Sequence, residues 1–221
     1  MSTMNDRQPE TDQQLGLLID LDRCIGCHAC TLVCQEEHGD PQGVQRMKVP
    51  TIGSGHHDIP AGVYPDVWMY FQPRMCQHCI NPPCIESCPF SAIEKRDDGV
   101  VTIIEEDCTG CNLCPPACPY DVIAINSDDM LVAVCDMCST RLDEGLHPAC
   151  EDACPGDAIF FGDINNGDSV INQQKLKLPK QAYVLSGVSS GDGDKNDRPT
   201  SRYQSQKAQH QADTSILAVD D

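Results

Sequence analysis

Four closely spaced cysteines in the middle of the chain constrain its fold more than any other feature. Residues 108–119 read Cys-Thr-Gly-Cys-Asn-Leu-Cys-Pro-Pro-Ala-Cys-Pro. This spacing, C-x2-C-x2-C-x3-C-P, is that of a bacterial ligand run for [4Fe–4S] clusters. In such a run the first three thiolates bind one cluster, and the fourth binds the other cluster of a pair. The motif therefore predicts a partner motif elsewhere in the chain.

The rest of the chain contains three further motifs of four cysteines. Their spacings are C-x2-C-x2-C-x3-C from Cys24, C-x2-C-x4-C-x3-C-P from Cys76 and C-x2-C-x11-C-x3-C-P from Cys135. Together the four motifs use all 16 cysteines. An apolar run precedes each motif. In three of the motifs the closing Cys-Pro is followed by a second apolar run, so the motifs form an internal repeat. We expect an α+β fold of two ferredoxin-like [4Fe–4S] modules with insertions, related by a pseudo-twofold internal repeat.

Two other uses of cysteine compete with this interpretation. A disulfide framework is typical of small secreted proteins, but residues 1–16 are polar and lack the apolar segment of a secretory signal peptide. Structural zinc sites also use four cysteines, but zinc ribbons space them as two separated pairs. Three cysteines in one short loop, with a fourth before proline, favour iron–sulfur clusters over zinc.

The chain is acidic and poor in aromatic residues. Its formal net charge is −19, and it has four Phe, one Trp and five Tyr in 221 residues. Nucleic-acid-binding proteins carry basic patches, so we expect no nucleic-acid partner. A solvated acidic surface that aids solubility is the simplest explanation of the charge, with a basic docking partner or a salt-rich habitat as alternatives. With so thin an apolar core, we expect the metal-free protein to be largely unordered.

Apolar runs and turn residues predict the secondary structure around the motifs. The expected strands are at residues 15–21, 67–71, 91–95, 100–104, 120–125, 130–134 and 158–161. Asp97, Asp98 and Gly99 should form the turn of one hairpin. Short helices are expected at residues 31–38 and 173–178, with a loop at 162–167.

The spacing of the motifs also predicts the domain organisation. The expected parts are a polar leader (1–14), an outer ferredoxin-like module of motifs one and four (15–40 plus 131–165), an insertion (41–73), an inner module of motifs two and three (74–130), a short C-terminal extension (166–185) and a mobile polar tail (186–221). Within the tail, residues 215–219 could be a short partner-binding segment.

The four motifs, in this order and at these spacings, resemble the four-cluster electron-transfer subunit of molybdopterin oxidoreductases of the dimethyl sulfoxide reductase type. The resemblance covers residues 15–165 and includes Asp143-Glu-Gly145, Pro148-Ala-Cys150 and Phe161-Gly-Asp163. Some relatives replace the second cysteine of the third motif and hold a three-iron cluster there. Because Cys111 is present, we expect four complete [4Fe–4S] clusters.

The resemblance also implies which cysteines share a cluster, because each fourth cysteine crosses to the partner motif of its module. The implied ligands are Cys24, Cys27, Cys30 and Cys154 for cluster 1, Cys34, Cys135, Cys138 and Cys150 for cluster 2, Cys76, Cys79, Cys84 and Cys118 for cluster 3, and Cys88, Cys108, Cys111 and Cys114 for cluster 4. Asn112-Leu113 and Pro115-Pro116 depart from the more polar or basic residues expected beside cluster 4.

The function implied by the resemblance is electron relay without a catalytic residue in this chain. Cluster 1 would face a catalytic subunit that holds molybdenum or tungsten, and cluster 4 a membrane subunit that binds quinone. Two alternatives stay open: a free-standing polyferredoxin, and the small subunit of a soluble molybdopterin enzyme. A zinc-bound interaction protein is the remaining class.

The expected location follows from hydropathy and the resemblance. No run of about 18 apolar residues occurs, so we expect no transmembrane helix. The sequence by itself predicts a cytoplasmic protein that associates with the membrane through its partners. In this family a folded subunit can also reach the periplasm with a partner that carries a twin-arginine signal.

A few polar residues near the motifs admit both structural and functional interpretations. Arg23, Arg74 and Arg141 could raise cluster potentials or steer docking, or be ordinary surface charges. His78 could donate to a cluster sulfur or pack within its loop. His56 and His57 are expected to face solvent.

Overall fold

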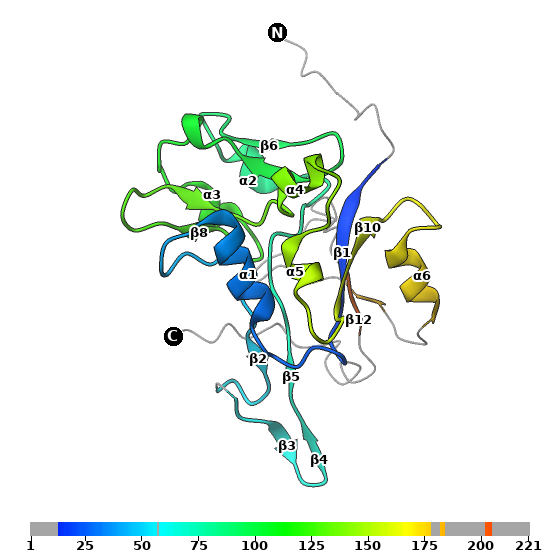
Figure 1. The fold of residues 1–221 in the computed structure, drawn as a ribbon. Helices are drawn as coiled ribbons and strands as arrows, with labels where there is room; N and C mark the ends of the chain where they lie inside the picture. The colour runs from blue at the N-terminus through cyan, green and yellow to red at the C-terminus, as the bar shows by residue number, and fades with distance from the viewer. Residues whose placement is uncertain (1–12, 57, 178–181, 184–201, 205–221) are drawn as a thin grey trace.

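The structure is a computed structural model that describes residues 13–56, 58–177, 182–183 and 202–204. Its central strand is β1 (Leu15–Asp20), in which all six residues are buried. β1 pairs antiparallel with β10 (Ile159–Asp163) and parallel with β12 (Arg202–Gln204), which pairs with β11 (Ala182–Tyr183). The sheet order is therefore β10-β1-β12-β11 (Figure 1). The strands expected at 15–21 and 158–161 are confirmed, and the second extends to Asp163.

Helix α6 (Val170–Lys177) lies against this sheet and begins before the expected residue 173. Ile171 is fully buried and packs with Leu18 of β1 and Phe160 of β10. The residues expected to form a mobile tail include β12, which the sequence did not predict. The leader up to residue 12, Pro179 and the candidate segment 215–219 lie outside the described residues.

Helix α1 (Ala29–His38) follows the first two cysteines of the first motif. It is longer than the expected helix and carries Cys30 and Cys34 on its buried side. Gly39 ends it in the left-handed region, at φ 61°, and its N–H is donated back to the carbonyls of Gln35 and Glu36. α1 packs against α5 (Ala149–Asp152), so the outer motifs are brought together by helix contact (Figure 1).

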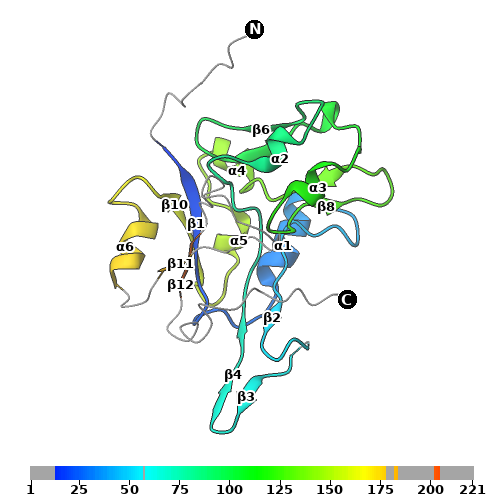
Figure 2. The same cartoon turned by 180° about the vertical axis from the view of Figure 1, so that it is seen from behind.

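The insertion contains two small antiparallel pairs. β2 (Thr51–Ile52) pairs with β5 (Tyr70–Phe71), and β3 (Ala61–Val63) pairs with β4 (Asp66–Trp68) in a hairpin that projects from the body (Figures 1 and 2). The single buried strand expected at 67–71 is wrong. The segment divides at Met69 between two partners, and Val67, on the hairpin, is 51% exposed.

The inner motifs alternate with short helices and hairpins. β6 (Ile93–Lys95) and β7 (Val101–Ile103) form the expected hairpin, with Gly99 at φ 88° in its turn. β8 (Ala124–Ile125) and β9 (Val132–Ala133) form the second, with shorter strands than expected. The helical elements of the inner motifs are α2 (Pro83–Glu86), η1 (Glu105–Asp107) and α3 (Cys114–Ala117), and α4 (Ser139–Asp143) lies in the fourth motif.

The core joins aliphatic side chains and cysteines in one cluster that extends through all four motifs. It includes Leu17 and Ile19 of β1 together with Cys30, Cys76 and Cys135. No helix in the described ranges is long and apolar enough to cross a membrane.

Candidate metal centres

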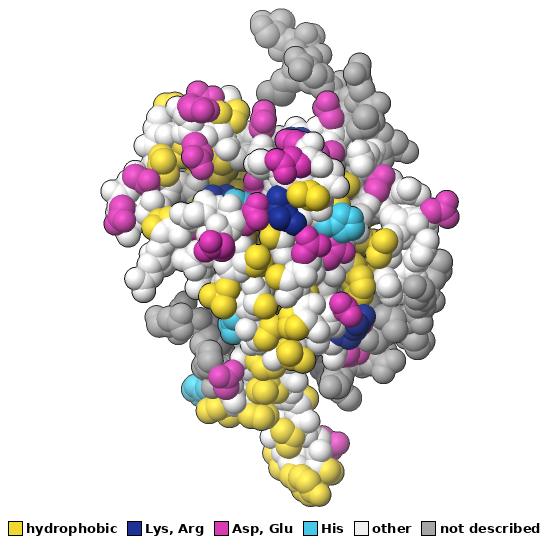
Figure 3. All heavy atoms as spheres, viewed as in Figure 1, with side chains coloured by type: hydrophobic (Ala, Val, Ile, Leu, Met, Phe, Trp, Pro, Cys, Tyr) yellow, Lys and Arg dark blue, Asp and Glu magenta, His cyan; other side chains and the backbone are white. Residues whose placement is uncertain are grey.

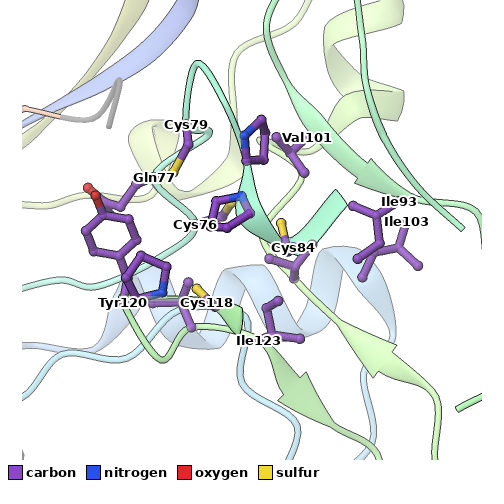
Figure 4. Close-up of a pocket in the computed structure, with 15 residues that line it drawn as sticks. Cys76, Gln77, Cys79, Cys84, Ile93, Val101, Ile103, Cys118, Tyr120 and Ile123 are labelled. Atoms are coloured by element: carbon purple, nitrogen blue, oxygen red, sulfur yellow. The ribbon is translucent and has the colours of Figure 1, made fainter. Parts of the chain in front are cut away.

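The cysteines of the second motif and the last cysteine of the third surround one hollow. Cys76, Cys79, Cys84 and Cys118 line a space with an empty volume of about 440 Å³ (Figure 4). Prolines and aliphatic side chains such as Ile93, Val101 and Ile123 form most of the remaining wall. The four thiols come from a loop, from α2 and from the end of α3, so only folding brings them together.

Two further hollows have the same construction. Cys24, Cys27, Cys30 and Cys154 line one of about 360 Å³. Cys88, Cys108, Cys111 and Cys114 line the other, of about 300 Å³. Cys27 and Cys111 are exposed, whereas most of the other cysteines are buried or half-buried. The first and fourth groups therefore reach the protein surface.

The remaining four cysteines are all buried and lie close enough to affect one another electrostatically. Burial raises the pKa of Cys135 well above its ordinary value, and Cys34 and Cys150 raise it further. Burial likewise raises the pKa of Cys138 to about 11, with Asp136 and Cys34 among the nearby groups that contribute. This second group brings the outer motifs together through α1 and α5.

The four groups follow one another through the molecule. Cys30 of the first group contributes to the raised pKa of Cys150 in the second. Val134, which directly precedes Cys135 of the second group, lines the hollow of the third. Cys114 of the fourth group contributes to the raised pKa of Cys84 in the third. The order of neighbours is thus first, second, third, fourth.

The donor set of these groups fits [4Fe–4S] clusters. Four thiols surround each hollow, and burial would keep them protonated without a cation, as it raises the pKa of Cys84 to about 12 and of Cys30 to about 11. Iron would stabilise the thiolate form. Within the described ranges, no three His, Cys, Asp or Glu side chains converge as the ligands of a single metal ion do. The sulfurs lie in the four groups that the resemblance implies, and ligation itself stays a prediction.

Comparison with known proteins decides the family. Residues 23–92 and 67–164 each match a 4Fe-4S dicluster domain. A candidate iron–sulfur protein of a dimethyl sulfoxide reductase from Halobacterium salinarum is 40% identical over 181 residues, 72% of this chain and 69% of that protein. The arsenate respiratory reductase iron–sulfur subunit of a Shewanella species is 31% identical over an alignment of 224 positions. The alignment covers 79% of this chain and 93% of that subunit. The chain belongs to this family of iron–sulfur subunits.

A further relative extends the range of reductases in the family. A tetrathionate reductase subunit of Salmonella typhimurium is 41% identical over 156 residues, covering 71% of this chain and 60% of that protein. The two dicluster matches and the 16 cysteines agree with four [4Fe–4S] clusters in the iron–sulfur subunit. Its fold is accordingly that of two ferredoxin-like dicluster domains with mixed α and β content.

Backbone amides of the subunit donate to several of the cysteine sulfurs, which the sequence did not reveal. Ala92 N–H donates to Cys88 Sγ and Ala158 N–H to Cys154 Sγ, both at 3.3 Å and both four residues after the cysteine. His78 N–H donates to Cys76 Sγ at 3.4 Å. Such donors stabilise negative charge on sulfur and thus favour thiolate ligands.

A half-buried ionic cluster beside the second group was also missed. His38 Nε2 lies 2.8 Å from Asp136 Oδ1, and His38 Nδ1 lies 2.9 Å from the Cys34 carbonyl oxygen. Burial alone would lower the pKa of His38, but the hydrogen bonds with Asp136 and Cys34 and the charge of Asp136 together outweigh it and raise that pKa to about 10. Arg46 pairs with Asp40 at 2.7 Å and donates to the Val134 carbonyl oxygen at 2.9 Å. Two cations therefore lie near the second group.

His78 is fully buried within the loop of the third group, which excludes a solvent-facing side chain. Its Nδ1 accepts the Val101 N–H at 2.9 Å, so the ring proton resides on Nε2. Burial lowers the His78 pKa to about 3, and the ring is neutral. Among the residues that the structure describes, Nε2 has no hydrogen-bond partner. Its proton is therefore available to a group that enters the neighbouring space.

The other basic residues differ in their proximity to the thiols. Arg23 lines the first hollow and pairs with Asp157 at 3.1 Å, whereas Arg141 pairs with Asp152 at 2.6 Å on the surface of α5. Lys95, which the sequence did not single out, donates to the Cys79 carbonyl oxygen at 2.8 Å.

Two described residues singled out in the sequence, Arg74 and His56, take no part in a thiol group. Arg74 donates to the Gln72 side chain at 3.3 Å. His56 is exposed as expected, and His57 lies outside the described residues.

Proposed function

We propose that this iron–sulfur subunit holds four [4Fe–4S] clusters in a row and relays electrons between a molybdopterin catalytic subunit and a quinone-reactive membrane subunit. The observation that carries this proposal is the spatial order of the four thiol groups. The group at each end of this row has an exposed cysteine, Cys27 in the first and Cys111 in the fourth. The relatives support it, since they are named as subunits of dimethyl sulfoxide, arsenate and tetrathionate reductases. Association with the membrane would come through partner subunits.

The proposed ligands are the three groups that line the hollows and the second group, whose buried thiols affect one another electrostatically. Cluster 1 would bind Cys24, Cys27, Cys30 and Cys154; cluster 2 Cys34, Cys135, Cys138 and Cys150; cluster 3 Cys76, Cys79, Cys84 and Cys118; and cluster 4 Cys88, Cys108, Cys111 and Cys114. Clusters 1 and 2 would belong to an outer module, residues 15–40 plus 131–165, and clusters 3 and 4 to an inner one, residues 74–130. The two modules would be related by a pseudo-twofold repeat.

The side chains of this chain would set the cluster potentials rather than perform chemistry. Each bound [4Fe–4S] cluster supplies a site for one electron, at a potential that depends on nearby charge, hydrogen bonds and exposure. The amides of Ala92 and Ala158 and the cations of Lys95 and Arg46 would favour the reduced, more negative state. The apolar walls would exclude water from the inner steps.

The deciding experiment is the metal content of the complex, purified anaerobically from its native source through a tag on this chain. Four clusters predict about sixteen irons per copy. Molybdenum or tungsten should co-purify with a large second chain. If the iron is present without another metal or chain, the subunit is instead a free-standing polyferredoxin. If a catalytic chain co-purifies without a membrane chain, the enzyme is of the soluble type.

Substituting one exposed ligand tests the assignment of cluster 4. Cys111→Ser should alter chiefly the EPR signal of that cluster, because serine provides a harder oxygen ligand in place of a thiolate. The matched control is Cys27→Ser, which carries the same change at the other exposed cysteine and should alter a different signal. An unchanged spectrum for Cys111→Ser, or the same altered signal in both variants, would contradict the assignment.

A further inference from the structure

The projecting hairpin exposes large apolar side chains that the described part of the chain leaves half or more uncovered. Residues 59–68 form what we call the finger, and its exposed side chains are Ile59 (51%), Val63 (81%), Tyr64 (89%) and Val67 (51%). Contiguous exposed apolar surface of this kind is typical of an interaction site.

The finger is nearly uncharged in an otherwise strongly acidic chain. Between residues 59 and 71 only Asp66 is charged, although the whole chain has a net charge of −19. In Figure 3 acidic side chains surround the upper body, whereas the finger is mainly hydrophobic. The surface that it fits is therefore apolar rather than basic. An anionic membrane is a poor match, because it repels so acidic a chain.

The base of the finger is packed on the loop that carries the exposed cysteine of the first group. The Phe71 ring would lie 2.6 Å from a Cβ placed on Gly26, which stands between Cys24 and Cys27. Ile25 in the same loop is 63% exposed. The finger therefore projects from the end of the molecule at which the first thiol group reaches the surface.

The finger is also held in a defined direction at its base. Thr51 Oγ1 donates to Asp58 Oδ1 at 2.6 Å, and Ser54 N–H donates to the Ile59 carbonyl oxygen at 3.1 Å. The pairing of β2 with β5 fixes the two chains that lead into it. A projecting element that is already ordered loses less conformational entropy when it binds.

We propose that the finger inserts into an apolar cleft of the molybdopterin catalytic subunit and fixes the approach of that subunit to the Cys27 end of the chain. This inference rests on the proposed function, which supplies the partner. Electron exchange requires a partner to come close to the first cluster, and the finger projects from the same end. A partner that reaches Cys27 therefore approaches the end of the molecule from which the finger projects.

The test uses the complete complex, purified anaerobically through a tag on this chain, with Val63→Glu and Tyr64→Glu combined. The expected result is at least about a tenfold weaker association of the catalytic chain, measured as molybdenum or tungsten per iron, since buried charges disrupt an apolar contact. Iron per copy should stay at the parent value. Leu146→Glu, at a side chain 47% exposed between α4 and α5, is the matched control and should leave the ratio unchanged.

The outcomes separate this inference from the proposed function. If the parent complex lacks both molybdenum and tungsten, the proposed function fails. If the parent contains one of them and the double variant retains it at the same affinity, only the role of the finger is overturned.

A photo-reactive phenylalanine analogue at position 64 gives an answer even if the double variant loses iron. Crosslinks to the catalytic chain support the proposal, whereas crosslinks only to a membrane chain, or none, overturn it. The proposal would also be overturned if the parent complex sedimented with anionic vesicles and the double variant did not.

Discussion

At the scale of single residues, His78 shows how the fold prepares an electrostatic environment for a thiol group. Its Nδ1 is occupied by the Val101 N–H, and its buried Nε2 proton lacks an acceptor among the described side chains and backbone groups. We expect the loaded protein to provide a sulfur acceptor in cluster 3. His78→Asn keeps an acceptor for the Val101 N–H but leaves no donor at the position of Nε2. It should lower the potential of cluster 3 by about 40 mV, the equivalent of about 1 kcal/mol for one electron.

An EPR-monitored redox titration measures this change, with His78→Gln as the control because its amide retains a donor near the Nε2 position. The Gln variant should stay closer to the parent potential than the Asn variant. Equal potentials in the parent and His78→Asn, accompanied by lower stability, would mean that His78 only packs within its loop.

At the scale of elements, two glycines of similar conformation separate backbone strain from a clash. Gly26 and Gly39 have φ values of 67° and 61°, but only Gly26 faces a neighbour, the Phe71 ring. Gly39→Ala should cost about 1 kcal/mol of unfolding free energy, because alanine is strained in the left-handed region. Gly26→Ala should cost more and reduce iron bound per chain, since Phe71 must move away from the ligand loop. Iron analysis measures the iron bound per chain, and denaturant-induced loss of the brown colour measures stability. Equal losses in the two variants would contradict the clash between an alanine at position 26 and Phe71.

At the scale of the whole molecule, the thiol groups occupy the positions that an apolar core would fill. Cys30, Cys76, Cys79 and Cys150 belong to the same buried cluster as the β-strand side chains. Removing iron with a chelator under reducing, anaerobic conditions should therefore unfold most of the chain. Far-ultraviolet circular dichroism and hydrogen exchange should both report loss of order. A metal-free protein that kept native exchange protection in β1 and β10 would contradict this expectation.

The predictions from the sequence succeeded where the information is local. The strand at 15–21 and the Asp-Gly hairpin were predicted from apolar runs and turn residues, because these elements depend on neighbouring residues. The strand at 67–71 was wrong because its two halves pair with different segments. The His38–Asp136 pair joins residues from the first and fourth motifs, and no local signal marks it.

The sequence by itself determined the kind of chemistry, since cysteine spacing within a loop decides what a single loop can bind. The tertiary structure decided how the loops are combined. It placed Cys154 with Cys24 and Cys118 with Cys76, ordered the four groups, and left Cys27 and Cys111 at the surface. It also packed the base of the nearly uncharged finger against the loop that carries Cys27. These features depend on contacts between segments far apart in the chain, and such contacts arise only when helices and sheets pack together.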